Sequence, residues 1–129
     1  MTEQPRKRFS IGARLRSFGY AFKGFAHFFA TQHNGWIHAL AAVVAIAAGW
    51  WLNISIVEWC IVALTIAAVF SAEMLNTAIE FIVDLVSPEH NELAGKAKDV
   101  GAAAVLVIAI AAVVVAVLIF GPKLVALGQ

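Results

Sequence analysis

Residues 69–87, VFSAEMLNTAIEFIVDLVS, place polar side chains inside an apolar stretch and decide the fold. The preceding residues 59–72 contain no charge, and apolar residues resume directly after Glu73. A carboxylate at membrane depth costs roughly 2.5 kcal/mol or more, which makes Glu73 a candidate functional residue. Further polar residues follow it at i+3, i+7 and i+11, on one face of a helix at about 100° per residue. These residues, which with Glu73 form the polar stripe, are Asn76, Glu80 and Asp84.

The composition predicts an integral membrane protein built only from α-helices. Of the 129 residues, 62% are hydrophobic and only 13% are charged, which is too apolar for a soluble domain of this size. We expect one membrane domain over residues 9–129, preceded by a basic, flexible tail at residues 1–8. Cys60 is the only cysteine, so no disulfide can form within the chain.

The apolar pattern predicts one surface helix and three membrane spans. Apolar residues recur every three or four positions in residues 9–30 among basic residues, which is typical of an amphipathic helix at a membrane surface. The alternative is a helix that packs only on its own bundle. The spans are expected at about residues 36–52, 58–86 and 100–120. Residues 32–35 should interrupt the helical pattern, residues 89–99 should form a polar loop and helix entry, and Gly121-Pro122 should end the third span.

The charge distribution predicts the orientation of the chain. Eight of the nine Lys and Arg residues precede the first span or lie between the second and third, and only Lys123 lies on the other side. The positive-inside rule then places the N-terminus and the 87–99 loop in the cytoplasm. The second span would be about 42 Å long, which exceeds the hydrocarbon core of roughly 30 Å. Its last turns, from about Glu73, should therefore reach the cytoplasmic interface.

The residues near that interface suit phosphoryl transfer to a lipid. Carboxylates bind Mg²⁺, lysine neutralises phosphate charge, and a deeper carboxylate such as Glu73 could take a proton from a lipid hydroxyl. A buried carboxylate would equally suit an ion-coupled transporter, and Asn76 alone would suit hydrogen bonding between helices. Three carboxylates on one face favour a functional site over such packing. The charged residues of the adjoining loop are Glu89, Glu92, Lys96, Lys98 and Asp99.

Other kinase and metal patterns are missing from the sequence. It contains neither a GxxxxGK[ST] loop nor the HRD and DFG elements of protein kinases. No spacing of Cys and His indicates zinc, and Lys96 is expected to be a solvated charge. The four histidines are expected at the surface or at interfaces rather than as ligands, and they are His27, His33, His38 and His90.

Two dense motifs make the resemblance specific. The first is EMLNTAIExxVD at residues 73–84, and the second is LAGKAKDVGAAAV at residues 93–105. Together with GYAFKG at residues 19–24 and NxxIH at residues 34–38, they resemble the bacterial diacylglycerol kinase and undecaprenol kinase family over about residues 9–122. The resemblance implies a homotrimer in the bacterial inner membrane that phosphorylates a lipid alcohol with ATP and Mg²⁺.

The resemblance also implies a role for individual residues. Glu73 corresponds to the proton-accepting glutamate and Glu80 to a metal-binding glutamate, with Asn76 and Asp84 supporting them on the same face. The lipid substrate is expected at Glu73 together with Phe18 and Arg14. The expected ATP-binding residues are Tyr20, Gln32, Glu80, Glu89, Asn91, Lys98 and Asp99.

Two positions depart from the family pattern. Gln32 stands where the family has a second metal-binding glutamate, so the site has one negative charge fewer. His90 directly follows Glu89, whereas the family places a histidine two residues after the glutamate. These departures leave open a family member with weak or lost kinase activity, beside the alternative of a transporter that uses Glu73. The residues do not decide between undecaprenol and diacylglycerol, although the EMLNTAIE motif slightly favours undecaprenol.

Overall fold

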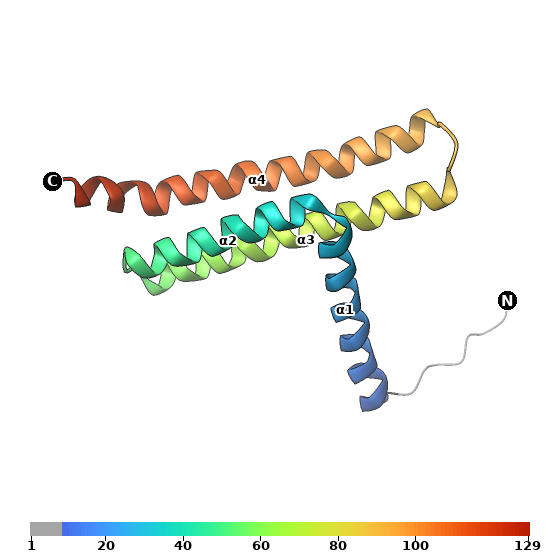
Figure 1. Ribbon diagram of the computed structural model, residues 1–129, viewed down its shortest axis with the longest axis horizontal. Helices are drawn as coiled ribbons and strands as arrows, with labels where there is room; N and C mark the ends of the chain where they lie inside the picture. Colours follow the sequence, from blue (N-terminus) through green and yellow to red (C-terminus); the bar gives the residue numbers. More distant parts are fainter. Residues whose placement is uncertain (1–8) are drawn as a thin grey trace. The chain divides into compact units, whose positions relative to one another are not determined.

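The computed structural model describes residues 9–129, which form helices and short connections without any strand. The tail predicted at residues 1–8 lies outside the described residues. Residues 9–31 and residues 32–129 are two separate compact units, and each is described by itself. The helices, drawn in Figure 1, are α1 (Ile11–Thr31), α2 (His33–Trp51), α3 (Ile56–Val86) and α4 (Glu92–Leu127).

The first unit consists of α1, and its helical character was predicted from the apolar repeat. The helix extends one residue further than the predicted range of 9–30 and begins two residues later. Phe18 and Phe22 are 65% and 74% exposed, so an apolar surface is available. Arg14 lies 5.7 Å from the ring centroid of Phe9. The placement of α1 at the membrane surface stays a prediction.

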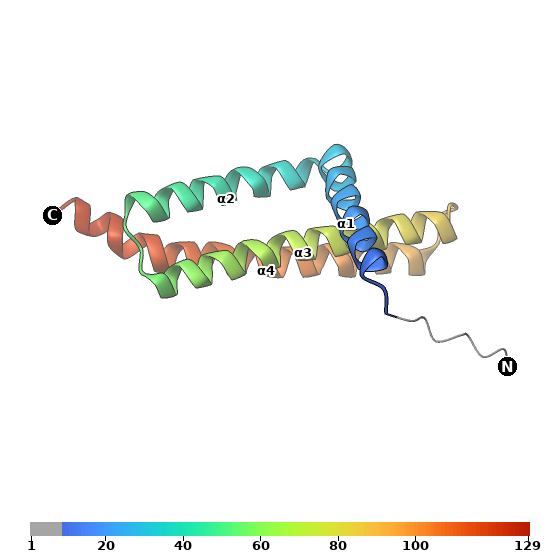
Figure 2. The same cartoon turned by 90° about the horizontal axis from the view of Figure 1, so that it is seen from below.

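The second unit is a bundle of α2, α3 and α4. In both views α3 and α4 lie side by side along most of their length, while α2 packs mainly against α3 (Figures 1 and 2). All three helices are long and apolar enough to cross a membrane. Few side chains are buried, and most large apolar residues stay exposed. Such helices, apolar on nearly every side, suit lipid or further helices as surroundings.

The ends of the helices have identifiable causes. The Ser55 hydroxyl accepts a hydrogen bond from the Glu58 amide at 3.3 Å, and the Glu58 carboxylate accepts one from the Ser55 amide at 2.6 Å. This capping box begins α3. In the preceding turn Asn53 has a positive φ of 49°, a conformation that asparagine tolerates better than most residues. The second span was predicted from residue 58, and the cap shifts its start to Ile56.

Helix α2 starts earlier than the predicted first span. The break predicted at residues 32–35 is confined to Gln32, whose extended backbone (φ −112°, ψ 110°) separates α1 from α2. Helix α2 therefore starts at His33 rather than near residue 36. Its predicted end at residue 52 is one residue beyond the observed end at Trp51.

The helix that carries the predicted third span is much longer than that span. Helix α4 begins at Glu92 because the Asn91 side-chain oxygen accepts hydrogen bonds from the amides of Leu93 and Ala94, at 2.9 and 3.1 Å. Most of the loop predicted at residues 89–99 is therefore helical. The helix also continues through Pro122 to Leu127. The fixed φ of proline is itself helical, and Pro122 removes only one backbone donor close to the helix end.

Candidate functional site

Glu73 lies on α3 and meets a partner from α2. Glu73 is only 4% exposed, and it is the one buried charged residue among residues 9–129. The Nε2 atom of His38 lies 2.8 Å from Glu73 Oε1. The histidine was expected merely to be interfacial, and its contact with the candidate base was not predicted. The signal available in the sequence was a second polar residue within an apolar span, inside the NxxIH motif.

One turn further along α3, Asn76 contacts both Glu80 and α4. The Asn76 Nδ2 atom donates a hydrogen bond to Glu80 Oε1 at 3.0 Å. Its Oδ1 atom is buried without a hydrogen-bond partner. A Cβ atom added to Gly101 would lie 2.3 Å from that oxygen, so only glycine permits this close approach of α4. The contact between Gly101 and Asn76 was not predicted, because nothing in the sequence neighbourhood of Gly101 points to Asn76.

The end of the polar stripe is joined to α4 by an ion pair. Lys98 Nζ lies 2.5 Å from Asp84 Oδ1, and the two side chains are 39% and 64% exposed. Such exposed pairs contribute little to stability, so both groups can exchange this contact for another charged ligand. Lys98 and Asp84 were both predicted to belong to the site, and the structure brings them together.

The residues of the polar stripe become more exposed toward the end of α3. Counted from Trp59 at 1.5 Å per residue, Glu73 lies about 21 Å along the helix, Glu80 about 31 Å and Asp84 about 37 Å. A hydrocarbon core of roughly 30 Å that began at Trp59 would contain Glu73, end near Glu80 and exclude Asp84. Along α3 the buried Glu73 is thus separated from the more exposed Glu80 and Asp84.

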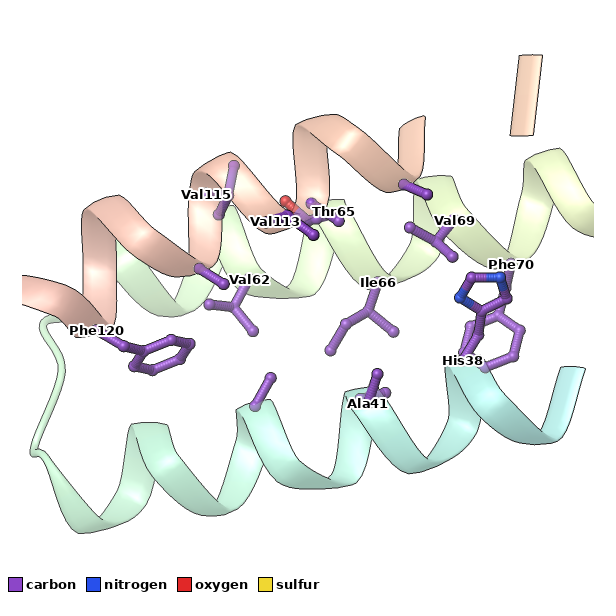
Figure 3. Close-up of a pocket in the computed structure, with 15 residues that line it drawn as sticks. His38, Ala41, Val62, Thr65, Ile66, Val69, Phe70, Val113, Val115 and Phe120 are labelled. Carbon is purple, nitrogen blue, oxygen red and sulfur yellow. The ribbon is translucent and has the colours of Figure 1, made fainter. Parts of the chain in front are cut away.

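An apolar cavity of about 280 Å³ lies between α2, α3 and α4. In Figure 3, His38 lies at one end of the row of labelled side chains and Phe120 at the other. Between them the walls carry small or branched apolar residues, such as Ala45, Ile66 and Val113. The cavity therefore leads to the histidine that contacts Glu73.

The remaining predicted residues lie in α1, in the turn before α4 and in the first turns of α4. Glu89 and His90 are exposed, as is Asp99 on α4. The Asn91 side-chain oxygen caps α4, and Lys96 forms an exposed ion pair with Glu92 at 2.6 Å. Within α1, which is a separate unit, Lys23 lies 5.9 Å from the ring centroid of Tyr20. The α1 residues predicted for lipid or ATP are Arg14, Phe18 and Tyr20.

Glu80 and Asn76 carry the oxygen atoms that a magnesium ion prefers. Within residues 9–129, no group of three or more His, Cys, Asp or Glu side chains could hold a metal ion. Mg²⁺, however, is usually bound by one or two carboxylates, with phosphate oxygens and water completing the shell. Glu80 supplies such a carboxylate, and the buried Asn76 Oδ1 is an uncommitted oxygen beside it. The half-buried Gln32 offers a neutral amide oxygen.

Known proteins match most of this chain. Residues 19–120 match the family model for prokaryotic diacylglycerol kinase. Undecaprenol kinase of Bacillus subtilis (strain 168) is 43% identical over 110 residues, which are 85% of this chain and 89% of that protein. Diacylglycerol kinase of Synechocystis sp. is 44% identical over 114 residues, covering 88% of this chain but 65% of that protein. Diacylglycerol kinase of Escherichia coli (strain K12) is 32% identical over 100 residues, covering 78% and 82%.

The match includes all of α2 and α3, most of α4 and therefore the whole polar stripe. The three apolar helices agree with a membrane enzyme. The chain belongs to the prokaryotic diacylglycerol kinase family, whose members are membrane-embedded lipid kinases.

Proposed function

We propose that this enzyme transfers the γ-phosphoryl group of ATP to a lipid alcohol at the cytoplasmic face of the bacterial inner membrane, with Glu73 as general base. The observation that carries the proposal is the buried Glu73 carboxylate, held by His38 at 2.8 Å where an apolar cavity ends. A lipid hydroxyl can reach this depth from the bilayer, whereas a water-soluble acceptor would have to leave water.

The nucleotide would bind at the shallower end of the stripe. Glu80, oriented by Asn76, would hold Mg²⁺, and Lys98 would exchange its exposed contact with Asp84 for a phosphate oxygen. Bound there, Mg²⁺ would neutralise the charge that develops on the phosphate oxygens. The other residues proposed to contact ATP are Tyr20, Gln32, Glu89, Asn91 and Asp99.

In the proposed reaction, Glu73 accepts the proton of the lipid hydroxyl as that O–H bond breaks. The hydroxyl oxygen forms a bond to the γ-phosphorus, and the bond from that phosphorus to the β–γ bridging oxygen breaks. ADP leaves with the electron pair of that bond, and the products are a lipid phosphate and a protonated Glu73. Phe18 and Arg14 are also proposed to contact the lipid.

Undecaprenol is the proposed substrate and diacylglycerol the alternative. The relative named undecaprenol kinase aligns over 89% of its own length, compared with 65% for the similarly identical diacylglycerol kinase of Synechocystis. The EMLNTAIE motif supports the same choice. We further propose that the enzyme is a homotrimer, because the large apolar faces of α2–α4 leave room for contacts between copies.

The second candidate is a family member with weak or lost kinase activity. It is favoured by Gln32, which offers a neutral oxygen where a carboxylate is expected. An ion-coupled transporter would also use Glu73, but it leaves the second polar group of Glu80, Lys98 and Asp99 without a role.

An assay of lipid phosphorylation tests these alternatives. The purified protein in lipid vesicles receives Mg-ATP and either undecaprenol or diacylglycerol, and the phosphorylated lipid is quantified. We expect turnover of undecaprenol, and Glu73→Gln should abolish it because the amide cannot accept the proton. Glu92→Gln, which removes an exposed acid with no assigned role, is the matched control and should stay within about twofold.

The outcomes separate the proposals. Turnover that survives Glu73→Gln would remove Glu73 as the base. Phosphorylation of neither lipid, despite measurable ATP binding, would identify the chain as a family member that has lost its activity.

A further inference from the structure

The contact between His38 and Glu73 links two helices at the most buried charge of the described chain. The two residues are 35 positions apart in sequence, and their side chains are 21% and 5% exposed. A separation of 2.8 Å lies within the range of hydrogen bonds that involve a charged group. Such bonds are shorter and stronger than neutral ones, so this contact can hold the carboxylate in one orientation.

The ionisation of Glu73 determines which nitrogen of His38 carries a proton. An ionised carboxylate can only accept hydrogen bonds, so the contact requires a proton on His38 Nε2. A neutral imidazole has one such proton. An ionised Glu73 therefore selects the tautomer that is protonated at Nε2 and leaves Nδ1 as an acceptor. The same tautomer orients the Oε1 atom of the carboxylate.

We propose that His38 is a positioning residue that orients Glu73 for its reaction with the lipid hydroxyl, an inference that rests on the proposed role of Glu73 as base. His38 Nε2–H holds Oε1 throughout the reaction, and Oε2 receives the proton from the hydroxyl. After that transfer Glu73 carries its new proton on Oε2, while Oε1 still accepts from His38. The Nε2 proton stays on His38 during the step, and the carboxyl group does not have to rotate.

The position of His38 on the cavity wall supports this role. The imidazole lies at one end of the apolar cavity (Figure 3), and its Nε2 atom contacts the Glu73 carboxylate. A carboxylate without a fixed partner can turn about its side-chain bonds, whereas the bond to His38 ties it to the backbone of a different helix. Misplacement of a reacting group by about 1 Å can reduce turnover by on the order of 100-fold.

Two variants of His38 test the proposal against a purely structural link between α2 and α3. His38→Leu removes the donor and should lower kcat by about 10- to 100-fold, with KM for ATP changed less than about twofold, because ATP binds at the shallower groups. His38→Gln keeps an N–H donor and should restore part of the lost kcat. His33→Leu, an exposed histidine of the same helix, is the matched control and should retain normal kcat.

Nitrogen-15 NMR of histidine-labelled protein gives a readout that does not depend on turnover. We expect His38 to be the Nε2–H tautomer in the unmodified enzyme and to lose that preference in Glu73→Gln. If Glu73→Gln remains active, the proposed base is wrong even where the tautomer is as expected. Wild-type kcat in His38→Leu would overturn the positioning role. An Nδ1–H tautomer of His38 in the unmodified enzyme would also overturn it. So would equal losses of kcat and thermal stability in His38→Leu and His38→Gln.

Discussion

At the scale of single residues, the site depends on polar atoms that find partners within an apolar bundle. Glu73 has His38, and Glu80 has the amide of Asn76. Buried polar groups without partners are costly, and Asn76 Oδ1 is the one buried side-chain N or O atom without a partner recorded for residues 9–129. It lies against Gly101, so the position of α4 and the orientation of the Asn76 amide depend on each other.

Replacement of Gly101 by alanine tests this dependence. The new Cβ atom would lie 2.3 Å from Asn76 Oδ1, which forces the amide or α4 to move. We expect a loss of about 1–3 kcal/mol in stability, together with reduced turnover because Glu80 loses its orientation. Thermal unfolding in detergent and the lipid kinase assay measure both effects. Gly121→Ala on the same helix, where no atom lies within 4 Å of the new Cβ, should be neutral.

The residue at position 32 tests the proposed metal site. Gln32→Glu adds a negative charge where the family pattern has a carboxylate, so the affinity for a divalent cation in the presence of a nucleotide should rise. An increase of about tenfold corresponds to 1.4 kcal/mol. Calorimetric titration of the nucleotide-bound protein measures it without turnover. An unchanged affinity would contradict the placement of Gln32 near the metal, and His33→Gln is a neighbouring control that changes no carboxylate.

At the scale of helices, the ends are determined by local hydrogen bonds rather than by the limits of the apolar runs. The capping box of Ser55 and Glu58 starts α3, and Asn91 starts α4. The start of α3 also contacts the end of α4, because Lys123 Nζ lies 3.4 Å from Glu58 Oε2. The same carboxylate therefore serves the helix cap and the contact between two helices.

Removal of the Ser55 hydroxyl should weaken the start of α3. Loss of an N-cap side chain lowers the free energy of unfolding by about 1 kcal/mol. Ser55→Ala should therefore unfold at a lower temperature or at a lower concentration of denaturing detergent. The cap lies at the opposite end of α3 from the polar stripe, and turnover at low temperature should therefore change little. Ser55→Asp, which keeps an oxygen that can cap the helix, should restore most of the stability. Equal stability of the alanine and aspartate variants would contradict the capping role.

At the scale of the whole molecule, the charges at the two ends of the bundle differ. The turn between α3 and α4 lies at one end, with Lys96 and Lys98 in the following turns, and Lys123 lies near the other end of α4. This asymmetry predicts that the turn faces the cytoplasm. The predicted orientation puts the shallow end of the stripe on the side where ATP is available.

Accessibility to a membrane-impermeant maleimide tests the orientation. In a chain whose single native cysteine is replaced (Cys60→Ala), His90→Cys should react only after the cells are opened. Lys123→Cys should react in intact spheroplasts, because its position would lie at the outer face. Reaction of both positions before lysis would contradict the proposed orientation. The unsubstituted Cys60→Ala chain is the control for background labelling.

The sequence by itself determined the helical class, the membrane location and the polar stripe, because a chain in lipid must satisfy its backbone hydrogen bonds within each helix. It also indicated the candidate residues of the polar stripe through their repeat on one face of α3. The helix ends predicted at Pro122 and at residues 32–35 were wrong. Residues that usually break helices end one only where the local backbone cannot keep helical geometry around them. The tertiary structure alone decided that His38 meets Glu73 and that Gly101 meets Asn76. Those contacts depend on how each helix is rotated and shifted against its neighbour, which no single helix encodes.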